Sequence, residues 1–267
     1  MNKKYNRQNF LGLDSQTQIE NTDVAVIGNG GGGSHIIQQL LHIGFKKIKV
    51  FDPDWVEESN THRLVGINYP QDVLNQVPKI EVAKRMALNI QGECSIETYE
   101  TSWQEKADKV KECKIVLGCV DSFDQRDQLE NFCRRNDIYY IDIGMGVITN
   151  VGDPPQMAGQ VILSAPKGPC MRCLGFITEE KLNQDRSRYG DAGPQPQVIW
   201  CNGTLASLAV GIAVDIVTKW TGRRDNVVYL SYDANFGTVE IHPRLKYMKF
   251  SECIHHTENG SAKYIDL

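Results

Sequence analysis

The sequence lacks the features that mark secreted, membrane-spanning or nucleic-acid-binding chains. No apolar run follows the charged residues of the N-terminus, so residues 1–8 do not resemble a signal peptide. The longest apolar stretch, residues 205–217, is too short to cross a bilayer. The formal net charge of −4 gives no electrostatic case for a nucleic-acid or membrane partner. We therefore expect a cytoplasmic protein in which residues 205–217 belong to a buried helix.

Internal repeats and low-complexity segments are also absent, which leaves an ordinary globular chain. Its 267 residues are 41% hydrophobic, which is ample for a core. We expect one domain over residues 1–267, with a nucleotide-binding half at 1–148. The other half, 149–267, would bind a partner or a second subunit and could carry a small metal-binding lobe.

A glycine cluster between an apolar strand and an apolar helix is the strongest single motif. Residues 24–27 are apolar and residues 36–41 have the spacing of a helix packed on a sheet. Between them, Gly28, Gly30 and Gly33 fit the G-x-G-x-x-G pattern. The missing Cβ atoms would let the backbone approach a phosphate at the positive end of the following helix.

An acidic residue at a suitable distance separates this motif from a merely flexible glycine turn. Asp52 ends a second strand at residues 48–51 and lies 19 residues beyond Gly33 (52 − 33). A carboxylate at about this separation hydrogen-bonds a ribose hydroxyl in nucleotide-binding folds. The two features together predict a nucleotide site.

Strands alternate with helices through the first half of the chain. Residues 115–121 form a buried strand that ends in Asp121, and residues 138–142 form another. Such alternation predicts a Rossmann-like, doubly wound α/β fold with a mainly parallel sheet. Because ligands bind outside the carboxyl ends of its strands, Gly28, Asp52 and Asp121 should meet at one edge.

From about residue 149 the pattern changes to short β-like runs among prolines and glycines. This half should continue the sheet in mixed or antiparallel form. Residues 179–197 are polar and read as a mobile loop, residues 200–220 as a helix, and residues 227–232 and 237–241 as strands around a turn.

Polar residues near the phosphate end exceed what a nicotinamide dinucleotide would need. Asn60, Arg63, Lys79 and Asp121 could all face the phosphates, and two cations with an acid suit a magnesium nucleoside triphosphate. Each has a structural alternative. Lys79 could be a solvated lysine in a first helical turn, Arg63 a loop salt bridge, and Asp121 a helix cap.

Taken together, these motifs resemble the ubiquitin-activating-enzyme superfamily, in particular its bacterial ThiF and MoeB adenylyltransferase branch. The resemblance covers most of the chain: residues 5–8, the glycine turn, residues 52–54 and 59–63, Pro78-Lys79, residues 119–121 and residues 170–174. It implies that the protein adenylates the C-terminal glycine of a ubiquitin-like or sulfur-carrier protein ending in Gly-Gly and releases pyrophosphate.

The resemblance also implies roles for individual residues. Asp52 would hold the ribose of ATP, and Gly30 with its neighbours the phosphates. Asn60, Arg63 and Lys79 would neutralise the triphosphate, while Asp121 would position magnesium. Arg7 would reach the ATP of a second subunit, which implies a homodimer.

A metal site is suggested by one cysteine pair among eight cysteines. Cys170 and Cys173 have the C-x-x-C spacing of half a tetrahedral zinc site. The family's second C-x-x-C is missing, and Cys253 with His256, or alternatively His255, stands in its place. Three thiolates and one imidazole would make an acceptable structural zinc site. The alternative is a pair of ordinary thiols.

A catalytic cysteine is harder to find. Many members of the family use a cysteine after the C-x-x-C segment, yet residues 179–197 contain none. The nearest candidate is Cys201, because a helix N-terminus at this point could lower its pKa. Simple packing of this thiol in the core is the alternative.

Three other functions compete with protein adenylation. The chain could activate a carbonyl on a modified tRNA base with ATP, which needs no catalytic cysteine, although the acidic balance and the C-x-x-C fit less well. It could be a dimerisation partner without turnover, against which the set of Arg63, Lys79 and Asp121 argues. An NAD oxidoreductase is more distant.

Overall fold

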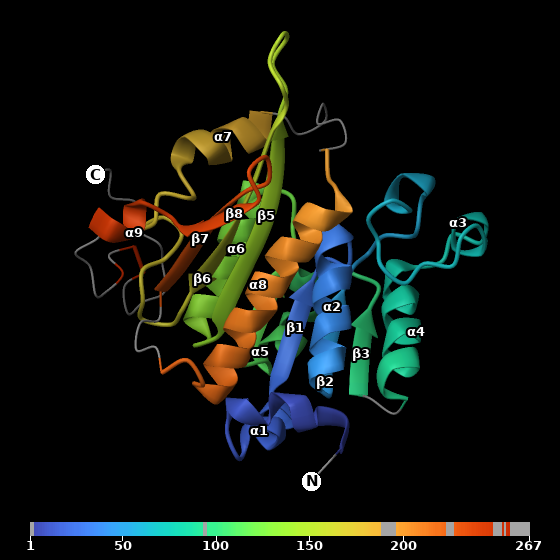
Figure 1. The fold of residues 1–267 in the computed structure, drawn as a ribbon. Helices are drawn as coiled ribbons and strands as arrows, with labels where there is room; N and C mark the ends of the chain where they lie inside the picture. The colour runs from blue at the N-terminus through green and yellow to red at the C-terminus, as the bar shows by residue number, and fades with distance from the viewer. Residues whose placement is uncertain are drawn as a thin grey trace.

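The structure is a computed structural model, and it describes residues 3–92, 95–187, 196–222, 227–247, 253, 255 and 256. In this part of the chain one sheet is flanked by helices on both faces (Figure 1). The strands are β1 (Asp23–Ile27), β2 (Lys47–Phe51), β3 (Ser95–Tyr99), β4 (Ile115–Gly118), β5 (Tyr139–Ile148), β6 (Gln156–Ser164), β7 (Val227–Asp233) and β8 (Thr238–Ile241). The α-helices are α1 (Ser15–Asn21), α2 (Gly31–Ile43), α3 (Gln71–Leu74), α4 (Lys79–Gln91), α5 (Ala107–Lys111), α6 (Phe123–Arg135), α7 (Glu179–Ser187), α8 (Ile199–Thr218) and α9 (Arg244–Tyr247), with 3-10 helices η1 (Lys3–Leu11), η2 (Glu58–Asn60) and η3 (Trp103–Lys106).

The sheet has the predicted doubly wound topology. Its strand order is β3-β2-β1-β4-β5-β6-β7-β8, the first five of these running parallel and the last three pairings antiparallel. The order reverses between β1 and β4, the point at which such sheets bind ligands. Register brings Ile27 beside Gly118, so the loops that follow both strands leave the sheet at one level.

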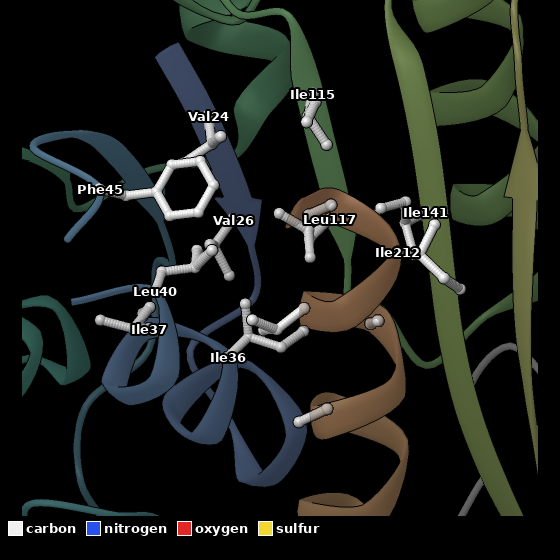
Figure 2. Packing of buried hydrophobic residues seen from close by; sticks show 14 of the residues in the cluster. Val24, Val26, Ile36, Ile37, Leu40, Phe45, Ile115, Leu117, Ile141 and Ile212 are labelled. Atoms are coloured by element: carbon white, nitrogen blue, oxygen red, sulfur yellow. The ribbon is translucent and has the colours of Figure 1, made fainter. Parts of the chain in front are cut away.

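Each face of the parallel strands builds its own apolar core, because successive side chains of a strand alternate. Val24 and Val26 point toward α2 and α8, where they pack with Ile36, Leu40 and Ile212 (Figure 2). Ala25 and Ile27 face the other core, which includes Leu129 of α6. The first core contains residues of both halves of the chain, so the two halves share one packed interior.

The helix α8 contributes much of this first core. By length and composition it could cross a membrane, and 56% of its most apolar window is buried inside the protein. Residues 205–217 lie within it, which confirms the expected buried helix.

Several element boundaries differ from the sequence expectation. The helix after the glycine turn begins at Gly31, inside the glycine run, rather than near residue 36. Antiparallel pairing starts with the long strand β5, not at residue 149. The expected mobile loop at 179–197 is wrong for its first part, because Glu179–Ser187 forms α7. Residues 188–195 lie outside the described part of the chain.

Candidate functional site

A cavity of about 730 Å³ opens at the carboxyl ends of the parallel strands. It sits where the strand order reverses, and its size suits a small-molecule ligand. Seven of the predicted ligand-binding residues line it: Gly28, Gly30, Asp52, Asn60, Arg63, Lys79 and Asp121. Gly33, Arg7 and Cys201 are not among the lining residues.

The glycine turn has the geometry of a phosphate cradle. Gly28 adopts a left-handed φ of +90°, and a Cβ there would lie 2.7 Å from the Cys119 carbonyl oxygen. Gly30 is the N-cap residue of α2 and no side chain caps the helix there, so the first-turn N–H groups are available to a ligand. Anions are favoured at this end of a helix because its dipole is positive there.

Gly33 has a packing role instead of the expected ligand contact. A Cβ at this position would overlap the carbonyl oxygen of Gly28, so only glycine lets α2 approach the end of β1 this closely. The neighbouring Gly31 and Gly32 are also closely packed, but against the ends of side chains and not against backbone. Their Cβ atoms would collide with the side chains of Asn202 and Ile143.

Asp52 is buried directly beside the glycine turn. One carboxylate oxygen accepts from the Asn29 N–H at 2.6 Å and the other from the Asp54 N–H at 2.9 Å. Burial raises the pKa of Asp52, while the neighbouring Lys79 and the two N–H donors oppose that rise. The two backbone bonds fix the carboxylate at the position expected for a ribose acceptor.

Lys79 lies in the first turn of α4, as predicted, and its side chain is only 11% exposed. Its ammonium forms an ion pair with Asp54 at 2.7 Å, and both residues line the cavity. The Lys79 carbonyl accepts from the Asn29 side chain at 2.6 Å, which links α4 to the glycine turn. Asn60 is buried nearby and accepts from the Glu57 N–H at 3.1 Å.

Arg63 retains a charge that the protein does not neutralise. Its guanidinium donates to the Ser59 carbonyl oxygen and lies 3.4 Å from the His62 ring. No carboxylate forms an ion pair with it among the residues described. The salt-bridge interpretation is therefore not supported, and the cation is free to meet phosphate.

Asp121 does not cap the helix that follows it. Ser122 is the N-cap of α6 and accepts from the Gln125 N–H at 3.1 Å. The exposed Asp121 carboxylate accepts instead from the Gln197 side chain at 3.3 Å, inside the cavity. It is thus placed to bind a ligand or a metal ion.

Arg7 lies on η1, far from the cavity of its own chain. Figure 1 places the N-terminal helices at the end of the sheet opposite the cavity, where β1 begins. Its side chain is exposed. A contact with ATP would thus have to be made with a second subunit.

Among the cavity residues that were not predicted from the sequence are Arg126, Lys181, Gln197 and Asn202. Arg126 of α6 is buried, where it forms an ion pair with Asp142 and donates to the Val120 carbonyl at 2.7 Å. Arg126 lies in the helix that follows Asp121, and nothing in its sequence position marks it as a cavity residue. The other three come from the second half of the chain and enter the cavity only through its tertiary fold.

The expectation that a helix terminus lowers the pKa of Cys201 is wrong. The thiol is fully buried among core residues, and burial raises its pKa to about 11. Cys119 lines the cavity, and burial holds its pKa well above the usual value of a thiol. Neither thiol carries the thiolate character that a nucleophile requires.

A second candidate site joins the loop after β6 to the C-terminal segment. Cys170, Cys173, Cys253 and His255 place their ligand atoms within 4.8 Å of one another. The Sγ atoms of Cys170 and Cys173 are 3.7 Å apart, as are those of Cys173 and Cys253. A tetrahedron with Zn–S bonds of about 2.3 Å has edges of about 3.8 Å, so this set fits zinc.

His255, not His256, completes the set of four ligands. The Nδ1 of His255 lies 3.0 Å from the Cys173 Sγ and 3.6 Å from the Cys170 Sγ. His256 instead approaches Cys170 and Glu130 on the other side, and burial lowers its pKa to about 4. The expectation that His256 is the fourth ligand is therefore wrong, and the alternative, His255, takes its place.

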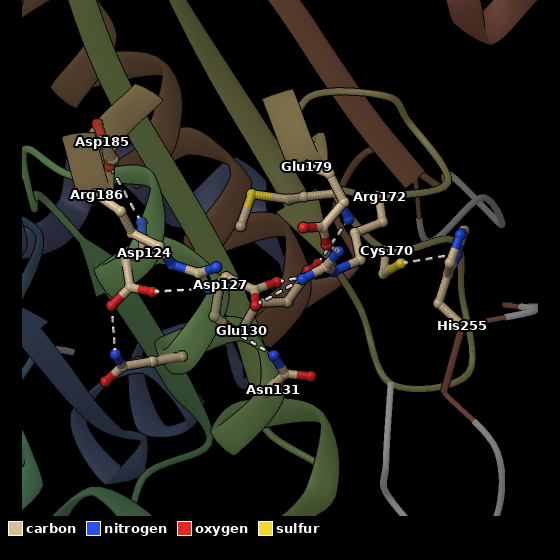
Figure 3. Close-up of polar contacts among 12 residues, drawn as sticks. Asp124, Asp127, Glu130, Asn131, Cys170, Arg172, Glu179, Asp185, Arg186 and His255 are labelled. Atoms are coloured by element: carbon tan, nitrogen blue, oxygen red, sulfur yellow. Dashed lines mark hydrogen bonds and ion pairs between the residues drawn. The ribbon is translucent and has the colours of Figure 1, made fainter. Parts of the chain in front are cut away.

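The loop that carries Cys170 and Cys173 is tied to two helices of the cavity (Figure 3). The Met171 N–H donates to Glu130 of α6 at 2.7 Å. Arg172 bridges Asp127 of α6 at 2.8 Å and Glu179 of α7 at 3.3 Å. The loop thus helps to position α7 against α6.

Comparison with known proteins agrees with this geometry. The ThiF family model matches residues 2–253. The SAMP-activating enzyme E1 of Haloferax volcanii is 28% identical over 86% of this chain and 80% of that protein. The molybdopterin-synthase adenylyltransferase of Haemophilus influenzae is 31% identical over 79% of this chain and 84% of that protein.

Other comparisons cover less or show the fold alone. The adenylyltransferase and sulfurtransferase UBA4 of Candida albicans is 29% identical, and the chain spans only 49% of its length. A crystal structure of E. coli MccB with AMPCPP and MccA has a TM-score of 0.73 at 21% identity, covering 90% of this chain and 71% of that one. This structural likeness confirms the Rossmann-like architecture.

Proposed function

The chain belongs to the ThiF family, and from this premise we propose that it is an adenylyltransferase acting on the C-terminal glycine of a ubiquitin-like or sulfur-carrier protein. One observation carries the proposal. The cavity brings together the glycine turn, Asp52, Arg63, Lys79 and Asp121 from separate segments. A phosphate cradle, a ribose acceptor, two cations and a free carboxylate form a set suited to a magnesium nucleoside triphosphate.

The proposed reaction joins the terminal carboxylate of the carrier to AMP. A carboxylate oxygen attacks the α-phosphorus of ATP, the bond to the bridging oxygen breaks, and pyrophosphate leaves. Arg63 and Lys79 would stabilise the negative charge that gathers on the phosphates, because preplaced cations need no reorganisation. Asp121 would hold the magnesium ion that accompanies the triphosphate.

Two glycines in the cavity are consistent with binding of the C-terminal tail of the carrier. Gly144 and Gly146 of β5 line the cavity, and a Cβ at Gly144 would lie 2.7 Å from Arg126. An extended Gly-Gly terminus would lie along this strand, because neither glycine places a side chain in the cavity. We also propose a homodimer in which each Arg7 reaches the ATP site of the partner subunit. The supporting observation is that Arg7 lies outside the cavity of its own chain.

Carrier-dependent pyrophosphate exchange tests the proposal. Purified chain with ATP, labelled pyrophosphate and a sulfur-carrier protein ending in Gly-Gly should exchange label into ATP. A carrier shortened by its last glycine is the matched control and should support no exchange. Exchange that proceeds equally with the shortened carrier, or with none of several such carriers, would contradict the proposed function.

We further propose that the chain stops at the acyl adenylate without forming a thioester. Replacing Cys201 with serine should therefore leave pyrophosphate exchange within about twofold of the parent, since its thiol is buried and protonated. Intact-mass spectrometry with carrier and ATP should show no thiol-sensitive adduct on either protein. An adduct present in the parent and lost in Cys201→Ser would overturn this prediction.

A further inference from the structure

The helix α7 contributes Lys181 and Asp185 to the lining of the cavity. Lys181 lines the cavity, two residues into a helix that is anchored near its other end by Asp185. The Asp185 carboxylate accepts from the Phe123 N–H and, at 3.3 Å, from the Asp124 N–H (Figure 3). The start of α6 and the C-terminal part of α7 are thus held together directly beyond Asp121.

Aromatic rings and one carbonyl oxygen hold the Lys181 ammonium. Its Nζ lies 4.9 Å from the ring centroids of both Phe123 and Phe176, and it donates to the Phe176 carbonyl at 2.8 Å. Cation–π contacts of this kind orient an ammonium without neutralising its charge. The side chain is therefore preorganised and still carries a full positive charge.

No carboxylate forms an ion pair with this ammonium among the residues that the structure describes, although Glu180 acts on it from a longer distance. Asp185, which also lines the cavity, is already engaged by the N–H groups of α6. The nearby Arg126 has Asp142 as its counter-ion, whereas Lys181 has none. Burial lowers the pKa of Lys181, as do the neighbouring Arg244 and Arg126, and Glu180 opposes this only in part, so an incoming anion would stabilise the charged form.

The nucleotide is not the expected source of that anion. The glycine turn, Arg63 and Lys79 form the phosphate end of the cavity, whereas Lys181 stands on α7 with the start of α6 and Phe176 around it. The acyl substrate would then approach from the side of α7. Its C-terminal segment carries at least one carboxylate, the one to be adenylated.

We propose that Lys181 is a substrate-specificity residue whose ammonium binds a carboxylate of the acyl substrate's C-terminal segment. The inference rests on the proposed function. The carboxylate has two chemical sources: the terminal carboxylate before it reacts, or an acidic side chain a few residues ahead of it. Both would approach as an extended chain over Gly144 and Gly146.

The test measures KM values in pyrophosphate exchange, with the full chain and a sulfur-carrier protein ending in Gly-Gly. Lys181→Met should raise the KM for carrier about tenfold, with little change in the KM for ATP, because one charged hydrogen bond is lost. Lys181→Arg keeps the charge and should recover most of the affinity. Lys109→Met, on α5 and paired with Glu112 at 2.8 Å, is the matched control and should match the parent.

Carrier variants identify the source of the carboxylate, by comparing binding affinities for parent and Lys181→Met. If the terminal carboxylate is the ligand, a carrier ending in a C-terminal amide should bind both proteins equally. If an acidic side chain is the ligand, neutralising the acidic residues of the carrier tail should instead remove the difference in affinity between the parent and Lys181→Met.

Two results would overturn the inference. One is that the parent chain shows carrier-dependent exchange and that Lys181→Met has the same KM for carrier as the parent. The other is a rise in the KM for ATP alone, which would place Lys181 at the triphosphate. Absence of carrier-dependent exchange in the parent chain would instead refute the proposed function itself, so the two failures are distinguishable.

Discussion

Replacing Asp121 with alanine should slow ATP–pyrophosphate exchange by about a hundredfold or more, which corresponds to roughly 2.7 kcal/mol of activation free energy. The carboxylate is exposed in the cavity, and its contact there is the Gln197 side chain at 3.3 Å. Ser122 and Asp185 already satisfy N–H groups at the start of α6. Removal of the Asp121 carboxylate should thus have little effect on the stability of the fold. The loss of rate would therefore report on catalysis.

Magnesium dependence and a neighbouring acid make this prediction specific. Asp121→Ala should also need a higher magnesium concentration for half-maximal exchange, since a hard oxygen ligand is lost. Asp124 lies three residues further on, in the first turn of α6, and is not among the cavity residues. Asp124→Ala should therefore exchange within a few-fold of the parent.

Arg63 offers a second substitution for the same exchange assay. Arg63→Ala should lower exchange by a similar factor, because no carboxylate of the described chain shares its charge. Lys79 differs in that Asp54 already pairs with it at 2.7 Å. Undiminished exchange in both Asp121→Ala and Arg63→Ala would remove the assignment of this cavity as an adenylation site.

The residues that could be predicted from sequence are those that follow a parallel strand. Gly28 comes after β1 and Asp52 after β2, and in a doubly wound sheet such positions converge by topology alone. Lys181 and Asn202 could not be found in this way. They reach the cavity because α7 and the start of α8 return over the sheet, which no local pattern encodes.

Other errors come from competing local effects. The helix α7 was missed because Leu182 is its one buried residue, so no apolar periodicity marks it. The helix terminus near Cys201 is worth about 0.3–1 kcal/mol. Burial outweighs this, since a rise in pKa from 9.0 to about 11 corresponds to about 2.7 kcal/mol.

The two adjacent histidines show a further limit. His255 and His256 both follow Cys253 within three residues, and spacing alone does not decide which one turns toward the thiols. In the structure the Nδ1 of His255 lies with the three Sγ atoms, whereas His256 is directed toward Glu130. The choice depends on how the C-terminal segment docks.

Replacing His255 with alanine should reduce bound zinc from about one equivalent per chain to well below half, and should lower the melting temperature by on the order of 10 °C. The ligand set joins Cys170 and Cys173 to a C-terminal segment some 80 residues away in sequence, as the separation of Cys173 and Cys253 shows. Loss of the metal would release that segment. It would also loosen the loop that holds Arg172 between α6 and α7.

A matched variant separates metal binding from packing. His256→Ala removes a half-buried ring of the same size and should retain zinc, because the four-ligand set does not include it. Elemental analysis with thermal unfolding measures both effects, and zinc retained by His255→Ala but lost by His256→Ala would reverse the assignment. Since Arg172 ties the metal loop to the helix that carries Lys181, the zinc-depleted His255→Ala protein should also show a raised KM for carrier, with the KM for ATP little changed. The zinc site would in this way support substrate binding from outside the cavity, by fixing α7 rather than by touching the reactants.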